Sequence, residues 1–213
     1  HFICITSQLK KAKTFGFDET TAIQFPNEIG GRYSIWSPIS LASILELEDD
    51  FLDFLKGGSK ADINLNSNNN YLEFIKTIVF SDIWNNNFDK KNIRVLLAYS
   101  WRLRFFTDYI QQLEMESIGK SANPCSRFKE TGQTIFGGFG STAQHSYFQL
   151  LHQGTSSFCS DIISVETDKK NSELLFAQSQ AQANLLAFGA DVDLKDYEKV
   201  NGQSPVNLLS LMK

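Results

Sequence analysis

The sequence is poor in the residues that build metal centres and disulfide frameworks. Its 213 residues include three cysteines and three histidines. Cys4, Cys125 and Cys159 lie far apart in the chain, and no two of them form a CxxC pair. This spacing excludes the usual zinc motifs and favours reduced thiols in a cytoplasm over a disulfide framework. We therefore expect a cytoplasmic protein that uses no metal and no cofactor.

Long apolar runs and an excess of positive charge are also missing. No stretch approaches the roughly 18 apolar residues of a membrane span. The opening HFICIT has no charged region ahead of its apolar stretch, so we do not expect a signal peptide. Lys and Arg number 20 against 24 Asp and Glu, a net charge of −4, which gives no general electrostatic hold on nucleic acid or anionic lipid. We expect neither as a partner.

The composition is that of a folded α/β protein. Hydrophobic residues make up 42% of the chain, and 213 residues suffice for one good-sized core. We expect a single domain over residues 1–213, with 201–213 as a loosely docked connector. Because the first residue is His1 rather than Met, we also expect a piece of something longer, or a processed product.

Short apolar runs alternate with helical patterns along the chain. The pattern predicts strands at 2–6, 22–25, 93–98, 134–136 and 162–166. It predicts helices at 38–47, 71–84, 102–117, 142–153 and 172–188, a short helix from Asp49 to Gly57-Gly58, and an Asn-rich loop at 64–70. The apolar run 206–212 has no clear partner. Alternating strands and helices predict a parallel sheet covered on both faces.

The first candidate site is Gly30-Gly31-Arg32-Tyr33-Ser34. Two glycines let the backbone approach a ligand closely, and Arg32 supplies a positive fork for an anion. The alternative is a plain turn followed by a solvated arginine, and composition alone favours that alternative.

The second candidate lies on the predicted helix 102–117. One stripe of this helix is apolar and is predicted to face the core: Leu103, Phe106, Ile110 and Leu113. Gln112 and Glu116 are four residues apart, hence on one face, next to Phe105 and Tyr109. A carboxylate beside aromatic rings can serve as a base, whereas Glu114 points elsewhere. An ordinary amphipathic helix end with solvated acids is the alternative, and spacing alone favours it.

The third candidate is the glycine turn at 138–140 that enters a helix carrying His145, with His152 two turns later. A glycine turn before a helix is a modest signal for an anion site. Two histidines at this spacing are poorly placed for one metal ion. Taken singly, each is expected to be a hydrogen-bonded structural residue.

Taken together, these segments resemble one family, glucose-6-phosphate isomerase (phosphoglucose isomerase). The matching strings are GGRYSIWSPISL at 30–41, RLRFFTDYIQQLEMESIGK at 102–120 and AQHSYFQLLHQGT at 143–155, with weaker matches at 1–17 and 174–189. The resemblance implies a sugar-isomerase (SIS) domain, the second of two in the family. This fold is a flavodoxin-like three-layer αβα sandwich around a mainly parallel five-stranded sheet.

The resemblance also implies a reaction and its residues. The family interconverts glucose 6-phosphate and fructose 6-phosphate through an enediolate. Glu116 matches the glutamate that moves the proton between C2 and C1, and Arg32 the arginine that stabilises the enediolate. Gln112 and Gly31 match residues that line the sugar site. His145 matches the histidine that helps to open the sugar ring in the neighbouring subunit's site, which implies a homodimer.

The resemblance leaves two departures to explain. The family's phosphate-binding loop and tail lysine lie outside the matched strings, so we expect this chain alone to be inactive. Residues around the matched side chains differ from the family pattern, as at Ser141-Thr142-Ala143 before Gln144 and His145. A non-catalytic sugar-phosphate-binding module, used for regulation or dimerisation, is therefore the alternative function.

Overall fold

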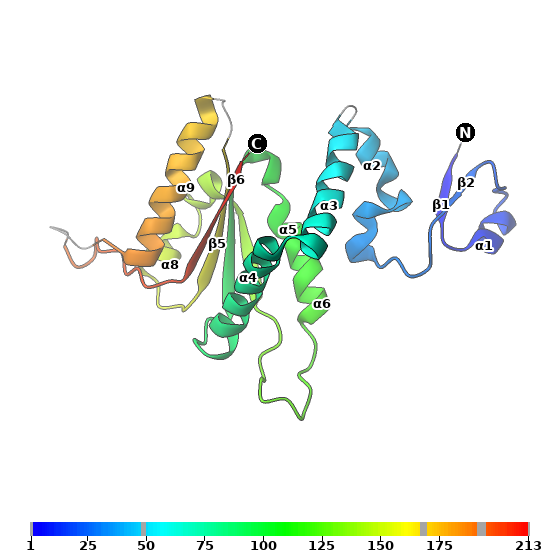
Figure 1. Ribbon diagram of the computed structural model, residues 1–213. Coiled ribbons are helices and arrows are strands. Elements are labelled where there is room, and N and C mark those ends of the chain that lie inside the picture. The colour runs from blue at the N-terminus through cyan, green and yellow to red at the C-terminus, as the bar shows by residue number, and fades with distance from the viewer. Residues whose placement is uncertain (1, 48–49, 167–169, 191–194, 213) are drawn as a thin grey trace. The chain divides into compact units, whose positions relative to one another are not determined.

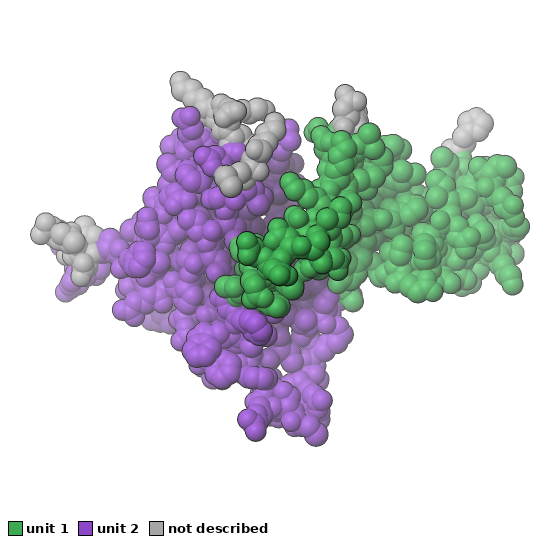
Figure 2. Space-filling view, in the orientation of Figure 1, with its two compact units in different colours: residues 1–78 green, residues 79–213 purple. Residues whose placement is uncertain are grey.

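The computed structural model describes residues 2–47, 50–166, 170–190 and 195–212 (Figure 1). The chain divides into two compact units, residues 1–78 and 79–213, which are coloured separately in Figure 2. Each unit is described by itself. No helix within the described part of the chain is long and apolar enough to cross a membrane.

Unit 1 contains a small parallel sheet and a series of helices. Strands β1 and β2 pair in parallel, with Cys4 opposite Ala22, and α1 follows β1 along the chain. The elements are β1 (Cys4–Thr6), α1 (Leu9–Thr14), β2 (Ala22–Gln24), η1 (Gly31–Trp36), η2 (Pro38–Ser40), α2 (Leu41–Leu45), α3 (Asp50–Ser67) and the first part of α4 (Asn69–Asn87).

Helix α3 continues through the two glycines that were expected to end it. The expected cap at Asp49 lies outside the described residues. Trp36 stacks on Phe54 of this helix, with ring centroids 4.6 Å apart. A Cβ added at Gly58 would meet the Trp36 ring at 2.7 Å, so this glycine lets the ring lie against the helix. The prediction of a helix end at Gly57-Gly58 is wrong because packing against Trp36 outweighs the low helix propensity of glycine.

Asparagine-rich stretches are helical where loops were expected. The predicted loop at 64–70 belongs mostly to α3 and α4, and α4 also includes 85–87. The Asn66 side chain donates to the carbonyl of Asp62, one turn back, at 2.8 Å. Such bonds satisfy a polar side chain inside a helix, so asparagine composition alone did not mark a break.

Unit 2 is built on a parallel sheet in the strand order β4-β3-β5-β6. Its elements are the rest of α4, β3 (Ile93–Tyr99), η3 (Trp101–Leu103), α5 (Phe106–Ile110), η4 (Gln111–Met115), α6 (Glu116–Ile118), β4 (Thr134–Phe139), α7 (Gly140–Ala143), α8 (Phe148–Gln153), β5 (Cys159–Glu166), α9 (Lys170–Phe188) and β6 (Val206–Met212). The α/β class and the parallel sheet are confirmed.

Two details of the predicted sheet are wrong. The main sheet has four strands among the described residues rather than five, because β1 and β2 pair with each other. Residues 206–212, expected to belong to a loosely docked connector, form β6 and pair with β5 along their whole length, from Ser160↔Val206 to Glu166↔Met212. An apolar run finds its partner through contacts distant in sequence, which local pattern does not specify.

Each face of the unit 2 sheet buries a separate core. Figure 1 shows α8 and α9 on one side of the strands and α5 and α6 on the other. The first core includes Val95, Leu97, Tyr99, Phe148, Ile162 and Leu186. The second includes Leu96, Ile110, Ile135 and Ile163, with Leu103, Phe106 and Leu113 packed against it. The unit is therefore a three-layer αβα arrangement, and the predicted apolar stripe of the 102–117 segment faces the core.

The two glycines of α3 provide a matched test of this packing. Gly57→Ala should raise the free energy of unfolding by about 0.5–1 kcal/mol, because an added Cβ meets no described atom within 4 Å and alanine is the better helix former. Gly58→Ala should be less stable than Gly57→Ala by about 1 kcal/mol, because its Cβ displaces the Trp36 ring. Urea unfolding of the 213-residue chain measures both. Equal effects of the two substitutions would contradict this account.

Candidate functional site

The Gly30-Gly31 pair leads into the 3₁₀ helix η1, which carries Arg32. The amide of Tyr33 donates to the carbonyl of Gly30 at 3.0 Å and closes the turn. Cβ atoms added at Gly30 or Gly31 would meet no described atom within 4 Å. Packing inside the chain therefore does not require glycine here, and the open backbone is accessible to a ligand. Arg32 is half-buried.

The segment predicted as one helix over 102–117 is a succession of four short elements, η3, α5, η4 and α6. Two side chains tie it to the sheet. Thr107 Oγ1 donates to the carbonyl of Leu96 at 3.2 Å, and Gln111 Nε2 donates to the carbonyl of Ile135 at 2.8 Å. The middle element, η4, is a turn of π-helix. Such turns are rare, and they are frequent at functional sites.

The π turn carries Gln112 and leads directly into Glu116, and both side chains are exposed. The two aromatic residues expected beside Gln112 and Glu116 differ in exposure: Phe105 is 64% exposed, and Tyr109 is half-buried. Glu114 points inward, away from the exposed pair, as expected. The segment therefore presents an amide and a carboxylate on the surface of unit 2 while its other face lies in the core.

The end of this segment is fixed by its glycine and lysine. The amide of Gly119 donates to the carbonyl of Met115 at 3.0 Å, and a Cβ at 119 would overlap that carbonyl oxygen. Lys120 Nζ donates to the carbonyl of Glu116 at 2.9 Å and also to that of Ser117. A cation at the carbonyl end of a helix is stabilising, so the backbone at Glu116 is held from its C-terminal side.

His145 lies in a turn rather than on a helix. The predicted helix over 142–153 is interrupted between α7 and α8 by the turn 144–147, and His145 is exposed there. Its amide donates to the carbonyl of Thr142 at 3.1 Å. Gln144 anchors the turn by donating from Nε2 to the Tyr99 hydroxyl at 3.2 Å. Burial raises the pKa of Tyr99 to about 12, so this hydroxyl stays protonated at neutral pH.

Glycines place strand β4 and helix α7 against β3. A Cβ at Gly137 would overlap the carbonyl oxygen of Leu96, and this residue has φ +155°. A Cβ at Gly140 would overlap the Tyr99 ring. Only a residue without a side chain allows this approach, so the two glycines determine where the turn that carries His145 begins.

His152 is held by neighbours, as a structural histidine would be. Its Nε2 lies 3.0 Å from Gln182 Oε1, and its ring meets the ring of Phe148 edge-on, with centroids 5.4 Å apart. His145 and His152 nevertheless line the same pocket, of about 400 Å³, together with Gln182. Sequence reasoning did not identify Gln182, because nothing local distinguishes it from the other glutamines of α9.

Glu116 and His145 lie at opposite ends of the sheet. The π turn contacts β3 through Arg94, the second residue of the strand, whereas the turn 144–147 contacts Tyr99, the last residue. Five strand residues span about 16 Å. The two side chains of β3 also belong to opposite faces of the sheet, because strand side chains alternate. The structure therefore does not bring Glu116 and His145 of one chain together on one small molecule.

The predicted site residues fall in both units. Gly31 and Arg32 belong to unit 1, and Gln112, Glu116 and His145 belong to unit 2.

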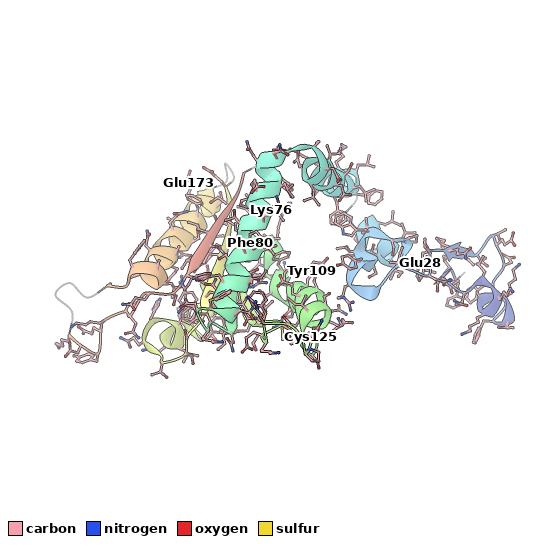
Figure 3. All side chains as sticks on the ribbon, turned by 60° about the horizontal axis from the view of Figure 1, so that its bottom comes forward. Glu28, Lys76, Phe80, Tyr109, Cys125 and Glu173 are labelled. Atoms are coloured by element: carbon pink, nitrogen blue, oxygen red, sulfur yellow. The ribbon has the colours of Figure 1, made fainter. Side chains whose placement is uncertain are left out.

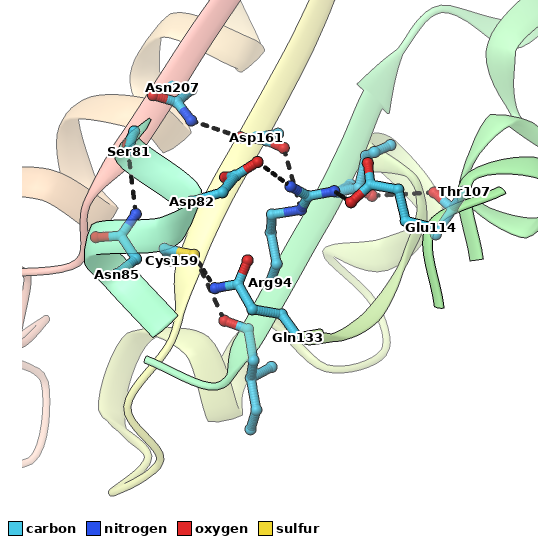
Figure 4. Close-up of polar contacts among 12 residues, drawn as sticks. Ser81, Asp82, Asn85, Arg94, Thr107, Glu114, Gln133, Cys159, Asp161 and Asn207 are labelled. Atoms are coloured by element: carbon cyan, nitrogen blue, oxygen red, sulfur yellow. Dashed lines mark hydrogen bonds and ion pairs between the residues drawn. The ribbon is translucent and has the colours of Figure 1, made fainter. Parts of the chain in front are cut away.

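A buried arginine lies beneath the π turn (Figure 4). The side chain of Arg94 is 4% exposed, and three carboxylates from three elements surround it. Its Nη1 donates to Asp82 Oδ2 at 2.6 Å, its Nη2 lies 2.5 Å from Glu114 Oε2, and its Nε lies 3.5 Å from Asp161 Oδ2. Asn207 of β6 donates to the other oxygen of Asp161 at 2.8 Å.

The cluster holds more negative than positive charge. Burial raises the pKa of Asp82 to about 6; Arg94 opposes this rise, and the charges of Asp161 and Glu114 add to it. For Arg94, burial acts to lower the pKa, but the three carboxylates outweigh burial and raise it. The guanidinium therefore stays charged, and Asp82 is the group of the cluster expected to take up a proton in mild acid.

Replacing Asp82 should change how stability depends on pH. A carboxyl with a raised folded-state pKa binds its proton more tightly in the folded state, so it lowers stability as pH rises from about 4 to about 6. The asparagine of Asp82→Asn does not ionise, so this variant does not lose stability from this position as pH rises. Its free energy of unfolding should rise relative to wild type between pH 4 and pH 7 by on the order of 1–3 kcal/mol. Urea unfolding at four pH values tests this, and a flat or falling difference would contradict it.

Comparison with known proteins assigns the family. The family model described as phosphoglucose isomerase matches residues 1–211. Glucose-6-phosphate isomerase of Francisella tularensis subsp. tularensis (strain WY96-3418) is 34% identical over 206 residues, which cover 91% of this chain and 37% of that protein. The Legionella pneumophila (strain Lens) enzyme is 31% identical over 214 residues, which cover 99% of this chain and 42% of that protein.

A solved structure agrees with the sequence comparisons. The crystal structure of a glucose-6-phosphate isomerase from Chlamydia trachomatis D/UW-3/Cx superposes with a TM-score of 0.78 at 28% identity, and the match covers 100% of this chain and 43% of that one. The chain thus spans about two fifths of the length of the relatives it matches. On sequence and structure together, the chain belongs to the phosphoglucose isomerase family.

Proposed function

We propose that this chain is the second SIS domain, residues 1–213, of an enzyme that interconverts glucose 6-phosphate and fructose 6-phosphate in the cytoplasm. The observation that carries the proposal is the π turn. The turn presents Gln112 outward and leads into the exposed Glu116, on a segment whose other face is packed in the core and bonded to two strands. A positioned carboxylate on a firm support is what proton transfer at carbon requires.

In the proposed reaction, Glu116 takes the proton from C2 of the open-chain aldose. The C2–H electrons form the C1–C2 double bond, and O1 takes the negative charge of the enediolate. The guanidinium of Arg32 stabilises this charge without competing for the proton, because arginine stays charged. Glu116 then returns the proton to C1, and a proton moves from O2 to O1 to give the ketose. Gly31 and Gln112 contribute a backbone and an amide to the sugar site.

We further propose that the active unit is a homodimer in which His145 serves the neighbouring subunit's site by helping to open the sugar ring. Two features support this. Glu116 and His145 of one chain are attached to opposite ends of β3, and both side chains are exposed. An exposed histidine remote from its own chain's base is suited to a site completed by a second copy.

A non-catalytic sugar-phosphate-binding module is the second candidate function. The observation that favours it is the turn 144–147, which replaces the predicted helix around His145. Sugar-phosphate binding without turnover by the full-length parent protein would select this candidate.

Replacement of the proposed base tests the enzyme assignment. In the full-length parent protein, Glu116→Gln should lower kcat by about 10²–10⁴-fold with little change in KM, because an amide keeps the shape of the side chain and loses its basicity. A coupled isomerase assay measures both constants. Glu173→Gln is the matched control. Glu173 is an exposed acid on α9, whereas Tyr109, an expected neighbour of Glu116, lies on α5 (Figure 3). Near-normal turnover of Glu116→Gln would refute the role of Glu116.

Co-expression of two inactive variants tests the shared site. Glu116→Gln and His145→Ala parent proteins should each be impaired alone. A mixed dimer combines the intact Glu116 of one subunit with the intact His145 of the other in one of its two sites. That site should be fully active, so the mixed dimer should have about half of the wild-type activity. Differently tagged subunits allow the mixed dimer to be purified and assayed. No recovery in the purified mixed dimer would show that both residues act within one subunit.

The 213-residue chain alone should show no isomerase activity. It spans about two fifths of its relatives' length, and Gln112 and Glu116 are exposed on its surface. A sugar needs contacts on several sides to be oriented for reaction. The same coupled assay, at high concentration of the purified chain, tests this. Measurable turnover that Glu116→Gln abolishes would contradict the expectation.

A further inference from the structure

In sequence, Glu114 lies two residues after Gln112, which the π turn carries, and two residues before Glu116, which follows the turn. It points into the protein instead of outward. Its Oε2 lies 2.5 Å from Arg94 Nη2, and its side chain is 33% exposed. Glu114 is therefore the point at which the turn that carries the proposed base is tied to a charge in the interior.

Arg94 is itself fixed from three directions. Asp82 holds it from α4 and Asp161 from β5, and Asn207 on β6 holds Asp161 in turn (Figure 4). A planar guanidinium with its nitrogens engaged by separate carboxylates has little freedom to rotate. The position that Glu114 takes is consequently set by the sheet and α4, not by the helix on which Glu114 lies.

The geometry of the segment makes this tie relevant to catalysis. A π turn is less favourable than an α turn and occurs mostly where other contacts compensate for it. Thr107 and Gln111 bond the segment to the sheet on the N-terminal side of Glu114, and Lys120 bonds it on the C-terminal side. Between these contacts, Leu113 packs against the core, and the ion pair of Glu114 joins the π turn to a charged side chain of strand β3.

We propose that Glu114, through its ion pair with Arg94, is a positioning residue that sets the direction of the Glu116 carboxylate toward the reacting carbon. This inference rests on the proposed isomerase function. Glu114 does not touch the sugar; it acts by holding the π turn between Gln112 and Glu116. Loss of the pair lets the turn relax, and the base moves relative to the carbon whose proton it takes.

The charge balance of the cluster makes the role separable from folding. Three carboxylates surround one guanidinium, so neutralising one of them leaves Arg94 compensated by the other two. Glu114→Gln keeps the volume of the side chain and a hydrogen-bond acceptor for Arg94 but removes the ionic attraction. We therefore expect this variant to fold and to bind sugar phosphate while its base is less well held.

The test uses the full-length parent protein with Glu114→Gln and Glu114→Ala. Both should lower kcat by about 10- to 100-fold, alanine more than glutamine, with KM for fructose 6-phosphate within about twofold. The primary deuterium isotope effect on kcat with glucose 6-phosphate labelled at C2 should increase, because a misplaced base makes proton transfer more fully rate-limiting. A merely structural role would reduce the amount of folded enzyme without changing this isotope effect.

Asp82→Asn is the matched control, because it neutralises a carboxylate on the same guanidinium from α4. Its kcat should fall less than that of Glu114→Gln, because asparagine keeps an acceptor for Arg94 Nη1 and the ion pair between Arg94 and Glu114 remains. An equal fall in kcat for Asp82→Asn and Glu114→Gln would overturn the proposal, because the cluster would then support the fold without a specific role for Glu114. If Glu114→Ala fails to fold, Glu114→Gln decides alone.

The outcomes also separate this inference from the proposed function. A wild-type parent without isomerase turnover would refute the proposed function. An active parent that Glu116→Gln inactivates, with unchanged kcat and isotope effect in Glu114→Gln, would refute only the positioning role of Glu114.

Discussion

The attraction between one buried guanidinium and the carboxylates around it is the constraint on which unit 2 depends. Arg94 projects from β3 into a space closed by α4, the π turn and β5. A charge in such a place is tolerated only when partners from several directions compensate for its lost hydration. Each carboxylate is held in place by its pairing with Arg94. The side chain of Arg94 therefore joins α4, the π turn and β5, which are distant in sequence, to strand β3.

This arrangement explains why an irregular helix persists where a regular one was expected. The apolar stripe from Leu103 to Leu113 satisfies the core with ordinary helical spacing, yet Glu114 must also reach Arg94. A single α-helix over 102–117 is not what the structure shows; it alternates short 3₁₀, α and π turns instead. The π turn occurs where the chain presents an amide and a carboxylate outward, and such turns are frequent at functional sites.

Local pattern in the sequence predicted the core strands well, because apolar β-prone runs such as 93–98 are buried wherever they pair. It failed where distant contacts decide the outcome. The partner of 206–212 is β5, whose paired residues lie 46 positions earlier in the chain, as in Ser160↔Val206. The helix through Gly57-Gly58 depends on Trp36. Family resemblance supplied Glu116 and Arg32 as candidates, whereas spacing alone favoured a solvated Glu116 and composition alone favoured a solvated Arg32.

Arg94 and Glu114 were harder to predict than the candidate site residues, which the family resemblance supplied. Arg94 lies in a run that is otherwise apolar, and Glu114 was assigned only a direction away from Gln112 and Glu116. Neither position carries a local signal for an ion pair, because residues 94 and 114 meet only after β3 and the following helices fold back on each other. Charges inside apolar runs are therefore useful markers for such clusters.

The bare backbone at Gly137 restricts which residue this position accepts. Any other amino acid there would bring a Cβ against the carbonyl of Leu96, within the hydrogen-bonded ladder between β3 and β4. Because β4 is an edge strand that leads directly into α7 and the turn bearing His145, a single substitution would disturb the pairing of the strand and the start of that turn together.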